Sequence, residues 1–187
     1  MEFCFATPAD SRALLDIYRQ YIDTAVTFQY ELPSEMEFAR RIEEIQLTYP
    51  FLVCRSGDVI LGYAYAHPVR PYVAYRWGAE LTIYLHSCAC TNGLGERLYG
   101  KLIDLLREQG VRTVYGCVTH PNPASEGLHE KLGFRRSGYW QRAGFKNGLW
   151  HDVIWFEKAL APYAANPEPI LPVYELDPER VMEILGQ

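Results

Sequence analysis

The sequence predicts a mixed α/β protein whose single sheet is mainly antiparallel. Alternating apolar residues indicate strands in the middle of the chain, and apolar residues at helical spacing indicate helices between them. A strand, a helix and a second strand follow one another over residues 77–118. Because such a crossover brings its two strands side by side in the same direction, we expect one parallel pair inside an otherwise antiparallel sheet.

The composition is that of one globular domain rather than a disordered chain. The 187 residues are 49% apolar and 22% charged, and the net charge of −5 argues against a nucleic-acid or acidic-membrane partner. No apolar run approaches the roughly 20 residues that span a bilayer, and the amino terminus lacks the pattern of a signal peptide. Five cysteines, an odd number, suit a reducing compartment, so we expect a cytoplasmic protein.

Local signals predict the elements of the first half of the chain. Thr7-Pro8-Ala9-Asp10 supplies an N-cap, a proline and an acid at the start of a helix. Ser34-Glu35-Met36-Glu37 has the pattern of a capping box, and Ser56-Gly57-Asp58 separates two apolar runs as a hairpin turn does. The expected elements are a strand at 2–6, a helix from 7 to 22, a helix at 34–47, and strands at 51–54 and 59–65.

The second half alternates strands and helices and ends in a proline-rich tail. Its expected elements are a strand at 77–86, a helix at 94–109, a strand at 111–118, a short helix at 122–133, and strands at 134–143 and 150–158. We therefore expect a domain over residues 1–160. The remaining residues, 161–187, are expected to form an arm that is extended over 161–172 and helical over 178–185.

A glycine-containing turn, Asn92-Gly93-Leu94-Gly95-Glu96, lies between a strand and an amphipathic helix. Backbone N–H groups there, together with the positive end of the helix dipole, can hold a diphosphate without any side chain. The alternative is a structural tight turn, since glycine serves that purpose as well. The turn has neither the G-x-G-x-x-G of dinucleotide-binding folds nor the G-K-[ST] of a P-loop.

Further along, Asn122-Pro123-Ala124-Ser125 precedes Leu128-His129-Glu130-Lys131-Leu132-Gly133-Phe134. With the glycine turn upstream, these segments resemble the GNAT superfamily of acetyl-CoA-dependent N-acetyltransferases. Four more segments narrow the resemblance to the phosphinothricin and methionine sulfoximine acetyltransferase branch, and these are residues 27–31, 75–80, 144–146 and 150–153. The resemblance covers residues 1–160 and leaves out the proline-rich tail.

The resemblance implies the GNAT acyltransferase fold, in which two central parallel strands splay apart. The implied activity is transfer of an acetyl group from acetyl-CoA, without a metal, to the α-amine of a small amino-acid-like acceptor, and the implied assembly is a homodimer. The pantetheine arm would pair with backbone at Ile83 and Leu85 and bond to Asn122, with Ser125 and His129 near the thioester. The residues implied for the diphosphate are Asn92, Gly93, Leu94, Gly95 and Glu96.

One position departs from the family pattern. Cys90 stands where the family normally has arginine or glutamine, so a charge-assisted contact to the phosphates is missing. We expect weaker coenzyme affinity, or compensation by Arg97 or Lys101 on the following helix. This departure keeps a second class of function open, namely a coenzyme A-binding module without turnover.

The same segment, His86-Ser87-Cys88-Ala89-Cys90, contains residue types that bind metals. Its H-x-C-x-C spacing differs from that of most structural zinc sites, and His120 is the one nearby candidate for a further ligand in the sequence. We therefore expect no metal site.

Two residues are candidates for proton transfer. Glu80 lies in an otherwise apolar strand, where partial desolvation would raise the pKa of its carboxylate toward the range of a general base. The alternative for Glu80 is a structural ion pair with Arg70 or Arg76. By the resemblance, His129 takes the place of a tyrosine that protonates the departing thiolate, so it is implied as the acid or as a second base. The alternative for His129 is a surface or capping residue.

The acceptor is expected at the two loops that flank the thioester. Arg70 and Arg76 suit a carboxylate through bidentate hydrogen bonds, and they argue against a cationic acceptor such as a polyamine or an aminoglycoside. A protein N-terminus is a further alternative acceptor. The aromatic residues expected to wall the pocket, unless they are ordinary core residues, are Phe28, Tyr30, Tyr72 and Tyr75.

Overall fold

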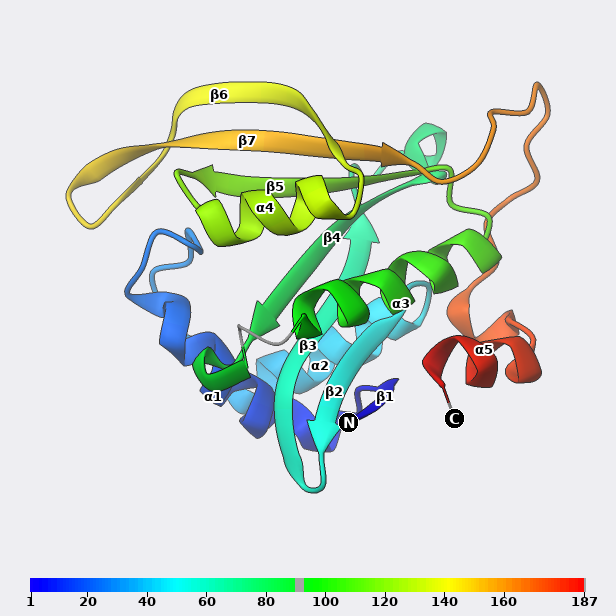
Figure 1. Cartoon of the computed structure of the whole chain (residues 1–187), viewed down its shortest axis with the longest axis horizontal. Coiled ribbons are helices and arrows are strands. Elements are labelled where there is room, and N and C mark those ends of the chain that lie inside the picture. The colour runs from blue at the N-terminus through cyan, green and yellow to red at the C-terminus, as the bar shows by residue number, and fades with distance from the viewer. Residues whose placement is uncertain (90–92, 187) are drawn as a thin grey trace.

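The computed structural model describes residues 1–89 and 93–186, so the predictions for Cys90 and Asn92 lie outside the described residues. One seven-stranded sheet runs through this part of the chain in the order β1-β2-β3-β4-β5-β7-β6 (Figure 1). The strands are β1 (Glu2–Phe5), β2 (Phe51–Ser56), β3 (Val59–Pro68), β4 (Gly78–Leu85), β5 (Thr113–His120), β6 (Arg135–Lys146) and β7 (Leu149–Ala159). The α-helices are α1 (Ser11–Ile22), α2 (Glu35–Gln46), α3 (Leu94–Glu108), α4 (Pro123–Lys131) and α5 (Pro178–Leu185).

The sheet combines antiparallel and parallel pairing. All neighbouring strands are antiparallel except β4 and β5, which run parallel. These two strands are connected through α3, which crosses over the sheet between them. The prediction of one parallel pair in a mainly antiparallel sheet is confirmed.

The parallel pair is short. Gly78, Ala79 and Glu80 of β4 pair with residues 113–115 of β5, and the described residues contain no further pair between the two strands. Both strands continue well beyond these pairs, β4 to Leu85 and β5 to His120. They therefore diverge, as Figure 1 shows, and the predicted splay is confirmed.

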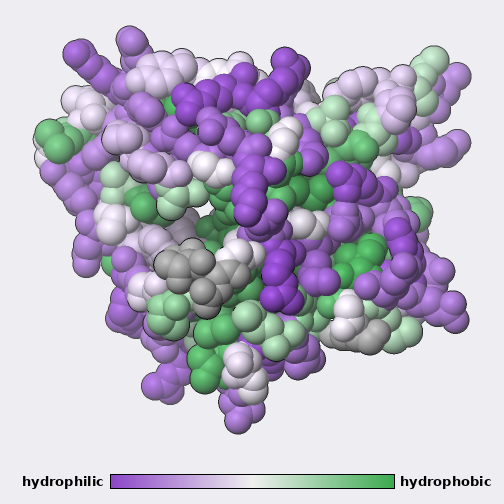
Figure 2. Space-filling model, in the orientation of Figure 1, coloured by the Kyte–Doolittle hydropathy of each residue, from purple (hydrophilic) through white to green (hydrophobic). Residues whose placement is uncertain are grey.

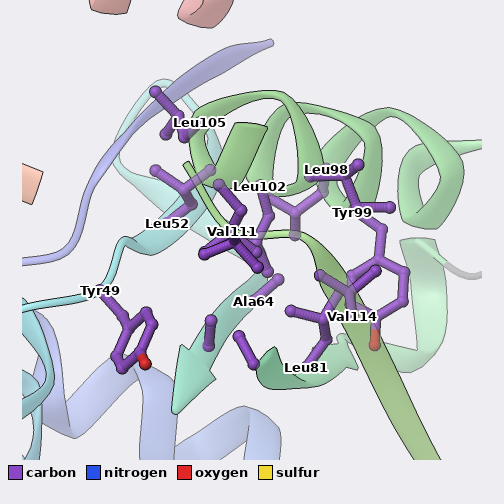
Figure 3. Close-up of a cluster of buried hydrophobic side chains, with 14 of the residues drawn as sticks. Tyr49, Leu52, Ala64, Leu81, Leu98, Tyr99, Leu102, Leu105, Val111 and Val114 are labelled. Atoms are coloured by element: carbon purple, nitrogen blue, oxygen red, sulfur yellow. The ribbon is translucent and has the colours of Figure 1, made fainter. Parts of the chain in front are cut away.

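Different helices cover the two faces of the sheet. On one face, Leu81 of β4 packs with the leucines of α3 in the cluster of Figure 3. On the other face, Tyr84 contacts Tyr18 and Tyr21 of α1, with ring centroids 4.9 and 5.2 Å apart. Because side chains alternate along a strand, Glu80 faces α1 with Tyr84, whereas Leu81 faces α3.

The hairpin of β6 and β7 is longer than predicted. The sequence predicts strands to 143 and from 150, but pairing continues to Lys146 and Leu149. Asn147 and Gly148 form the turn, with φ of 53° and 76°. Positive φ at both central residues is the backbone of the tight turn that favours Asn-Gly. The residues expected as a loop are thus strand, and the hairpin end reaches the segment between α1 and α2.

The C-terminal segment folds back onto α3. The Leu171 N–H donates to the Gln109 carbonyl at 2.8 Å, just after α3 ends. Three residues of this segment are buried in the same core as the α3 leucines, and these are Val173, Leu176 and Leu185. Through these residues the described part of the segment, 161–186, shares a core with the sheet. Within the part of the chain that the structure describes, no helix is long and apolar enough to cross a membrane.

Leu102 tests the core of Figure 3, because it lies on the buried face of α3 and is 0% exposed. Truncating a buried leucine loses transfer free energy and leaves a cavity, so Leu102→Ala should lower the free energy of unfolding by about 2–5 kcal/mol in urea denaturation. Leu47→Ala is the control, since Leu47 is 67% exposed, and it should cost less than about 1 kcal/mol. Equal losses in the two variants would contradict this core.

Candidate active site

A cavity of about 540 Å³ occupies the gap between the diverging strands. Its walls come from β4 and β5, from the amino-terminal part of α3, from the length of α4, and from the segment between α1 and α2. Figure 2 shows the surface hollowed near the middle of this face. The predicted site residues that line the cavity are Phe28, Glu80, Ile83, Leu85, Gly93, Gly95, Glu96, Asn122, Ser125 and His129.

The unpaired stretch of β4 directs backbone polar groups into this gap. The His86 N–H donates to the Leu61 carbonyl at 2.8 Å, which fixes the residues of β4 that bond to β3. Because hydrogen-bonding direction alternates along an antiparallel strand, the N–H and C=O groups of Ile83 and Leu85 point the other way, toward β5. The Tyr21 hydroxyl donates to the Leu85 carbonyl at 2.5 Å. Ile83 therefore presents a strand edge to the cavity.

The start of α3 supplies a second wall. Gly93 is the N-cap, with φ of 67° in the left-handed region that glycine adopts without strain. At Gly95 a Cβ would come within 3.3 Å of the Leu85 side chain, so glycine keeps the backbone of the first turn close to the cavity. The Leu94 side chain is buried in the core and does not line the cavity. The first turn of α3 thus offers backbone at its glycines, while Glu96 adds a carboxylate to the cavity wall.

The cations expected near this turn lie elsewhere. Arg97 and Lys101 lie over the ring of Phe3, at 5.1 and 4.9 Å from its centroid, and neither lines the cavity. The lysine that does line it is Lys131 of α4, whose Nζ is 2.5 Å from the Glu96 carboxylate. The structure therefore directs the side chains of the expected compensating residues to Phe3 rather than into the cavity.

Glu80 lies where the strands separate. It is half-buried, and its neighbours across the sheet are His67 of β3 and Tyr115 of β5. Burial raises the pKa of Glu80, while the positive charges of His67 and Arg70 act in the opposite direction. Among the described residues, no ion pair joins Glu80 to Arg70 or Arg76. The carboxylate is therefore held in the cavity without the structural ion pair that was its alternative role.

His129 reaches the cavity from α4 and is 3% exposed, so the alternative of a surface residue is wrong. Its Nδ1 is 2.8 Å from the Ser125 carbonyl, which can only accept, so the proton is on Nδ1. Nε2 is then an acceptor, 3.4 Å from the Tyr99 hydroxyl. Burial lowers the pKa of His129, which keeps the imidazole neutral at neutral pH.

A glycine lets the His129 ring lie against β5. Gly116 is the first residue of β5 after its pairing with β4 ends, and a Cβ there would overlap the imidazole. Gly116 follows Tyr115, the partner of Glu80, so it faces the opposite side of the sheet. His129 and Glu80 therefore line one cavity from opposite faces of the sheet, with the gap between the strands joining them.

The start of α4 is fixed by a buried carboxylate that the sequence analysis did not identify. Asn122 is the N-cap, and its Oδ1 accepts from the Ser125 N–H at 3.2 Å. Glu126 accepts from the Asn122 N–H and approaches His120 Nδ1, both at 2.8 Å, and it pairs with Arg136 at 3.1 Å. The hydrogen bond from the Asn122 N–H, together with the one from His120, lowers the pKa of Glu126. This network holds Asn122 at the cavity wall.

Most of the residues predicted for the acceptor do not line the cavity. The segment between β3 and β4 joins them at the end where β4 and β5 are still paired, whereas the cavity opens at the other end. Arg76 lies over the Trp77 ring at 5.6 Å, and Tyr75 lines a separate cavity of about 250 Å³. The predicted acceptor residues that the structure does not bring to the main cavity are Tyr30, Arg70, Tyr72, Tyr75 and Arg76.

Three cavity residues of β5 were not predicted, namely Cys117, Val118 and Thr119. Cys117 and Thr119 follow Tyr115 at alternate positions, so they share the face of Glu80. Cys117 is exposed to the cavity, and desolvation by the cavity walls, with the charge of Glu80 nearby, raises the pKa of its thiol to about 12, so the thiol is neutral. The alternation along β5 was the signal that could have identified Cys117 and Thr119.

Comparison with known proteins decides the family. Residues 4–155 match the acetyltransferase (GNAT) domain. The chain belongs to the GNAT family. It is 37% identical over 172 residues to a phosphinothricin N-acetyltransferase of Streptomyces viridochromogenes, covering 91% of this chain and 93% of that protein. It is also 29% identical over 167 residues to an L-methionine sulfoximine/L-methionine sulfone acetyltransferase of Salmonella typhimurium, covering 88% and 98%.

A solved structure supports the same assignment. The GNAT chain resembles a phosphinothricin acetyltransferase of Sinorhizobium meliloti, solved in complex with acetyl-CoA, with a TM-score of 0.84 and 32% identity. The match covers 92% of this chain and 95% of that one. The predicted GNAT membership, fold and acetyltransferase activity are confirmed.

Residues 1–89 and 93–186 of this GNAT acetyltransferase contain no group of three or more His, Cys, Asp or Glu side chains placed to hold a metal ion. In the segment considered for metal binding, the Cys88 N–H lies 3.3 Å from His86 Nδ1.

The buried His129 of this acetyltransferase should make the stability of the fold depend on pH. Because burial lowers its pKa in the folded protein, the unfolded chain binds more protons there below about pH 6.5. The free energy of unfolding should therefore fall as the pH drops through this range, and it should fall less in His129→Gln, which cannot take up that proton. Urea denaturation of both proteins between about pH 5 and pH 7 measures the difference. An identical pH dependence would contradict a buried neutral imidazole.

Proposed function

We propose that the chain transfers the acetyl group of acetyl-CoA to the α-amine of a small amino-acid-like acceptor, as the names of its relatives indicate for them. One observation carries the proposal. Glu80, a half-buried carboxylate whose pKa is raised by burial, lies where β4 and β5 separate, in a cavity that borders an unpaired strand edge. A base beside a slot for an extended donor is what this reaction requires.

The donor fits the half of the cavity that offers backbone. Acetyl-CoA supplies the activated acetyl group. Ile83 would pair with the pantetheine arm as an added strand does, and Asn122 would bond the arm from the wall of α4. Gly93 and Gly95 leave the positive end of α3 open to the diphosphate.

Glu80 would act as the general base. An α-amine is largely an ammonium at neutral pH and must lose a proton before it can attack a carbonyl carbon. A carboxylate with a raised pKa accepts this proton more readily than an ordinary one, directly or through a water molecule. Glu80 is therefore proposed to take the proton from the acceptor.

The proposed role of His129 follows from its proton. In the neutral form the proton is on Nδ1 and is bonded to the Ser125 carbonyl, so Nε2 accepts rather than donates. An acid role would need a proton brought to Nε2, and the Tyr99 hydroxyl at 3.4 Å is the group that faces it. Burial raises the pKa of Tyr99, so this hydroxyl keeps its proton. We therefore propose that His129 serves as the second base, through Nε2, at the thioester end of the cavity.

The acceptor would lie on the side of Glu80. Phe28 lines that part of the cavity, and Arg70 is close enough for its charge to oppose the raised pKa of Glu80. Arg76 lies over Trp77 instead. Of the two arginines proposed to bind an acceptor carboxylate, Arg70 is thus better placed.

A homodimer is also proposed. The β6–β7 hairpin exposes large apolar side chains. A second copy of the chain that packs on them would remove them from water. They are Tyr139, Trp140, Phe145, Leu149 and Trp150.

The four described cysteines, at 4, 54, 88 and 117, are free, which supports a reducing compartment such as the cytoplasm. The net charge of −5 supports a partner other than nucleic acid or an acidic membrane.

Light scattering tests the homodimer. The protein should have twice the 21.5 kDa mass of one chain, and Trp150→Glu should shift it toward the monomer because a charge cannot be buried in an apolar interface without cost. Leu47→Glu, at an exposed leucine outside the hairpin, is the control and should leave the mass unchanged. A monomer at all concentrations would contradict the proposal.

Glu80→Gln tests the reaction. Release of free coenzyme A thiol should be detected with methionine sulfoximine or phosphinothricin as acceptor, and Glu80→Gln should reduce kcat by about 100-fold or more because the base is lost. Acetyl-CoA affinity, measured by calorimetry, should change less than about twofold, since the side chain leaves the donor half of the cavity intact.

Glu157→Gln is the matched control, because Glu157 is also a neighbour of Tyr115 in the sheet but pairs with Arg135. It should retain activity. Full activity in Glu80→Gln would remove Glu80 from the mechanism. Turnover only with polyamines, aminoglycosides or peptides would replace the acceptor class, and acetyl-CoA binding without turnover on any amine would make the chain a binding module.

A further inference from the structure

Lys146, the last residue of β6, is buried, and the hydrogen-bond partners of its ammonium lie outside its own hairpin. It is 2% exposed, and its Nζ donates to the carbonyls of Ile22 and Thr27 at 2.6 Å each. Among the described residues, none of the ion pairs includes Lys146. A buried ammonium without an ion pair is costly, so its two carbonyl partners are the interactions that offset the cost.

The rest of the hairpin end touches the same segment, residues 23–30, which we call the acceptor loop. Asn147 Nδ2 donates to the Asp23 carbonyl at 2.8 Å, and the Tyr30 hydroxyl donates to the Phe145 carbonyl. The ring of Phe28 lies against Gly144, where a Cβ would overlap it. Figure 1 shows the hairpin end beside this loop. The hairpin end and the acceptor loop therefore form one unit, with Lys146 at its centre.

The acceptor loop borders the cavity on the side of Glu80. Val26, Thr27 and Phe28 line the cavity, and the Thr27 hydroxyl is 2.6 Å from that of Tyr18 on α1. The donor half of the cavity is built from other elements, the unpaired part of β4 and the starts of α3 and α4. A group that fixes the acceptor loop can therefore act on one substrate and leave the other unaffected.

We propose that Lys146 is a positioning residue that holds the acceptor loop against the cavity and so sets the affinity for the acceptor. Its ammonium links the last residue of α1, Ile22, to Thr27 of the loop, directly before Phe28. Without this link the Phe28 ring would lose its fixed place in the cavity wall. This inference rests on the proposed function, because it assigns a residue to the acceptor of that reaction.

The test compares Lys146→Met with Lys146→Arg and Lys158→Met. The methionine keeps the stem of the side chain and removes the donor, whereas arginine keeps a donor and a charge. Lys158 is the matched control, because it is a partly buried lysine of the neighbouring strand β7 whose Nζ donates to the Leu132 carbonyl and does not touch the acceptor loop.

In Lys146→Met the KM for the acceptor should rise about tenfold or more, which corresponds to the loss of hydrogen bonds from a charged donor. The acetyl-CoA dissociation constant and kcat at saturating acceptor should change less than about threefold, because the donor half and Glu80 are intact. Lys146→Arg should recover most of the acceptor affinity. Lys158→Met should leave the acceptor KM within about twofold even where it lowers stability.

Hydrogen exchange provides a readout that does not depend on activity. The amides of residues 23–30 should exchange faster in Lys146→Met than in the wild type, while those of α3 and α4 stay the same. Unchanged exchange in the loop, or an unchanged acceptor KM in an active enzyme, would overturn the inference alone. A wild-type protein that acetylates no amine would overturn the proposed function together with the acceptor role of Lys146.

Discussion

The separation of β4 from β5 after Glu80 is the constraint on which the rest of the site depends. Two parallel strands that could pair over eight residues each form only three pairs. Pairing stops where Gly116 follows Tyr115 in β5, and the His129 ring lies against that glycine. A side chain at 116 would displace the imidazole, so a small residue in the middle of a strand marks a close approach rather than a weak strand. The opened edge costs backbone hydrogen bonds, and Tyr21 recovers one of them at Leu85.

Two titratable groups of the cavity, Glu80 and His129, are held toward their neutral forms, and burial is the main cause for each. It raises the pKa of Glu80 and lowers the pKa of His129. The consequences for stability have opposite signs. Glu80 binds protons more tightly in the folded state, so it costs stability as the pH rises above the pKa of an ordinary glutamate. His129 binds them less tightly, so it costs stability as the pH falls. Neither group stabilises the fold at these pH values, whereas proton transfer in an active site commonly uses groups whose pKa is shifted from its ordinary value.

The sequence predicts the donor half of the site better than the acceptor half, and the reason is physical. Gly93, Gly95 and Asn122 lie at the junctions between a strand and the following helix. Turn and capping residues at such junctions can be recognised from a few consecutive residues of the sequence. The acceptor half depends on contacts between distant segments. Lys146 and Ile22 are 124 residues apart, and nothing near either residue in the sequence indicates the contact. The composition of the loop before β4 led to a wrong prediction, since Tyr75 and Arg76 were expected at the acceptor. They lie at the paired end of β4, away from the opening of the cavity. Asn147-Gly148 was a local signal for a tight turn that the strand prediction at 143 and 150 missed.

This division also bears on how the acceptor can change while the reaction stays the same. The proposed donor half would meet its ligand with main-chain groups of β4 and α3, and substitutions alter main-chain groups little as long as the glycines remain. The proposed acceptor half would meet its ligand with side chains of residues 23–30, a loop held from outside by the β6–β7 hairpin. Substitution of residues such as Val26 or Phe28 would reshape one wall of the cavity without moving Glu80, because Glu80 is fixed by its pairing on both sides in the sheet. In the proposed reaction the sheet would thus carry the chemistry and a loop would select the amine, with Lys146 as the buried charge among the contacts that hold this loop to the hairpin.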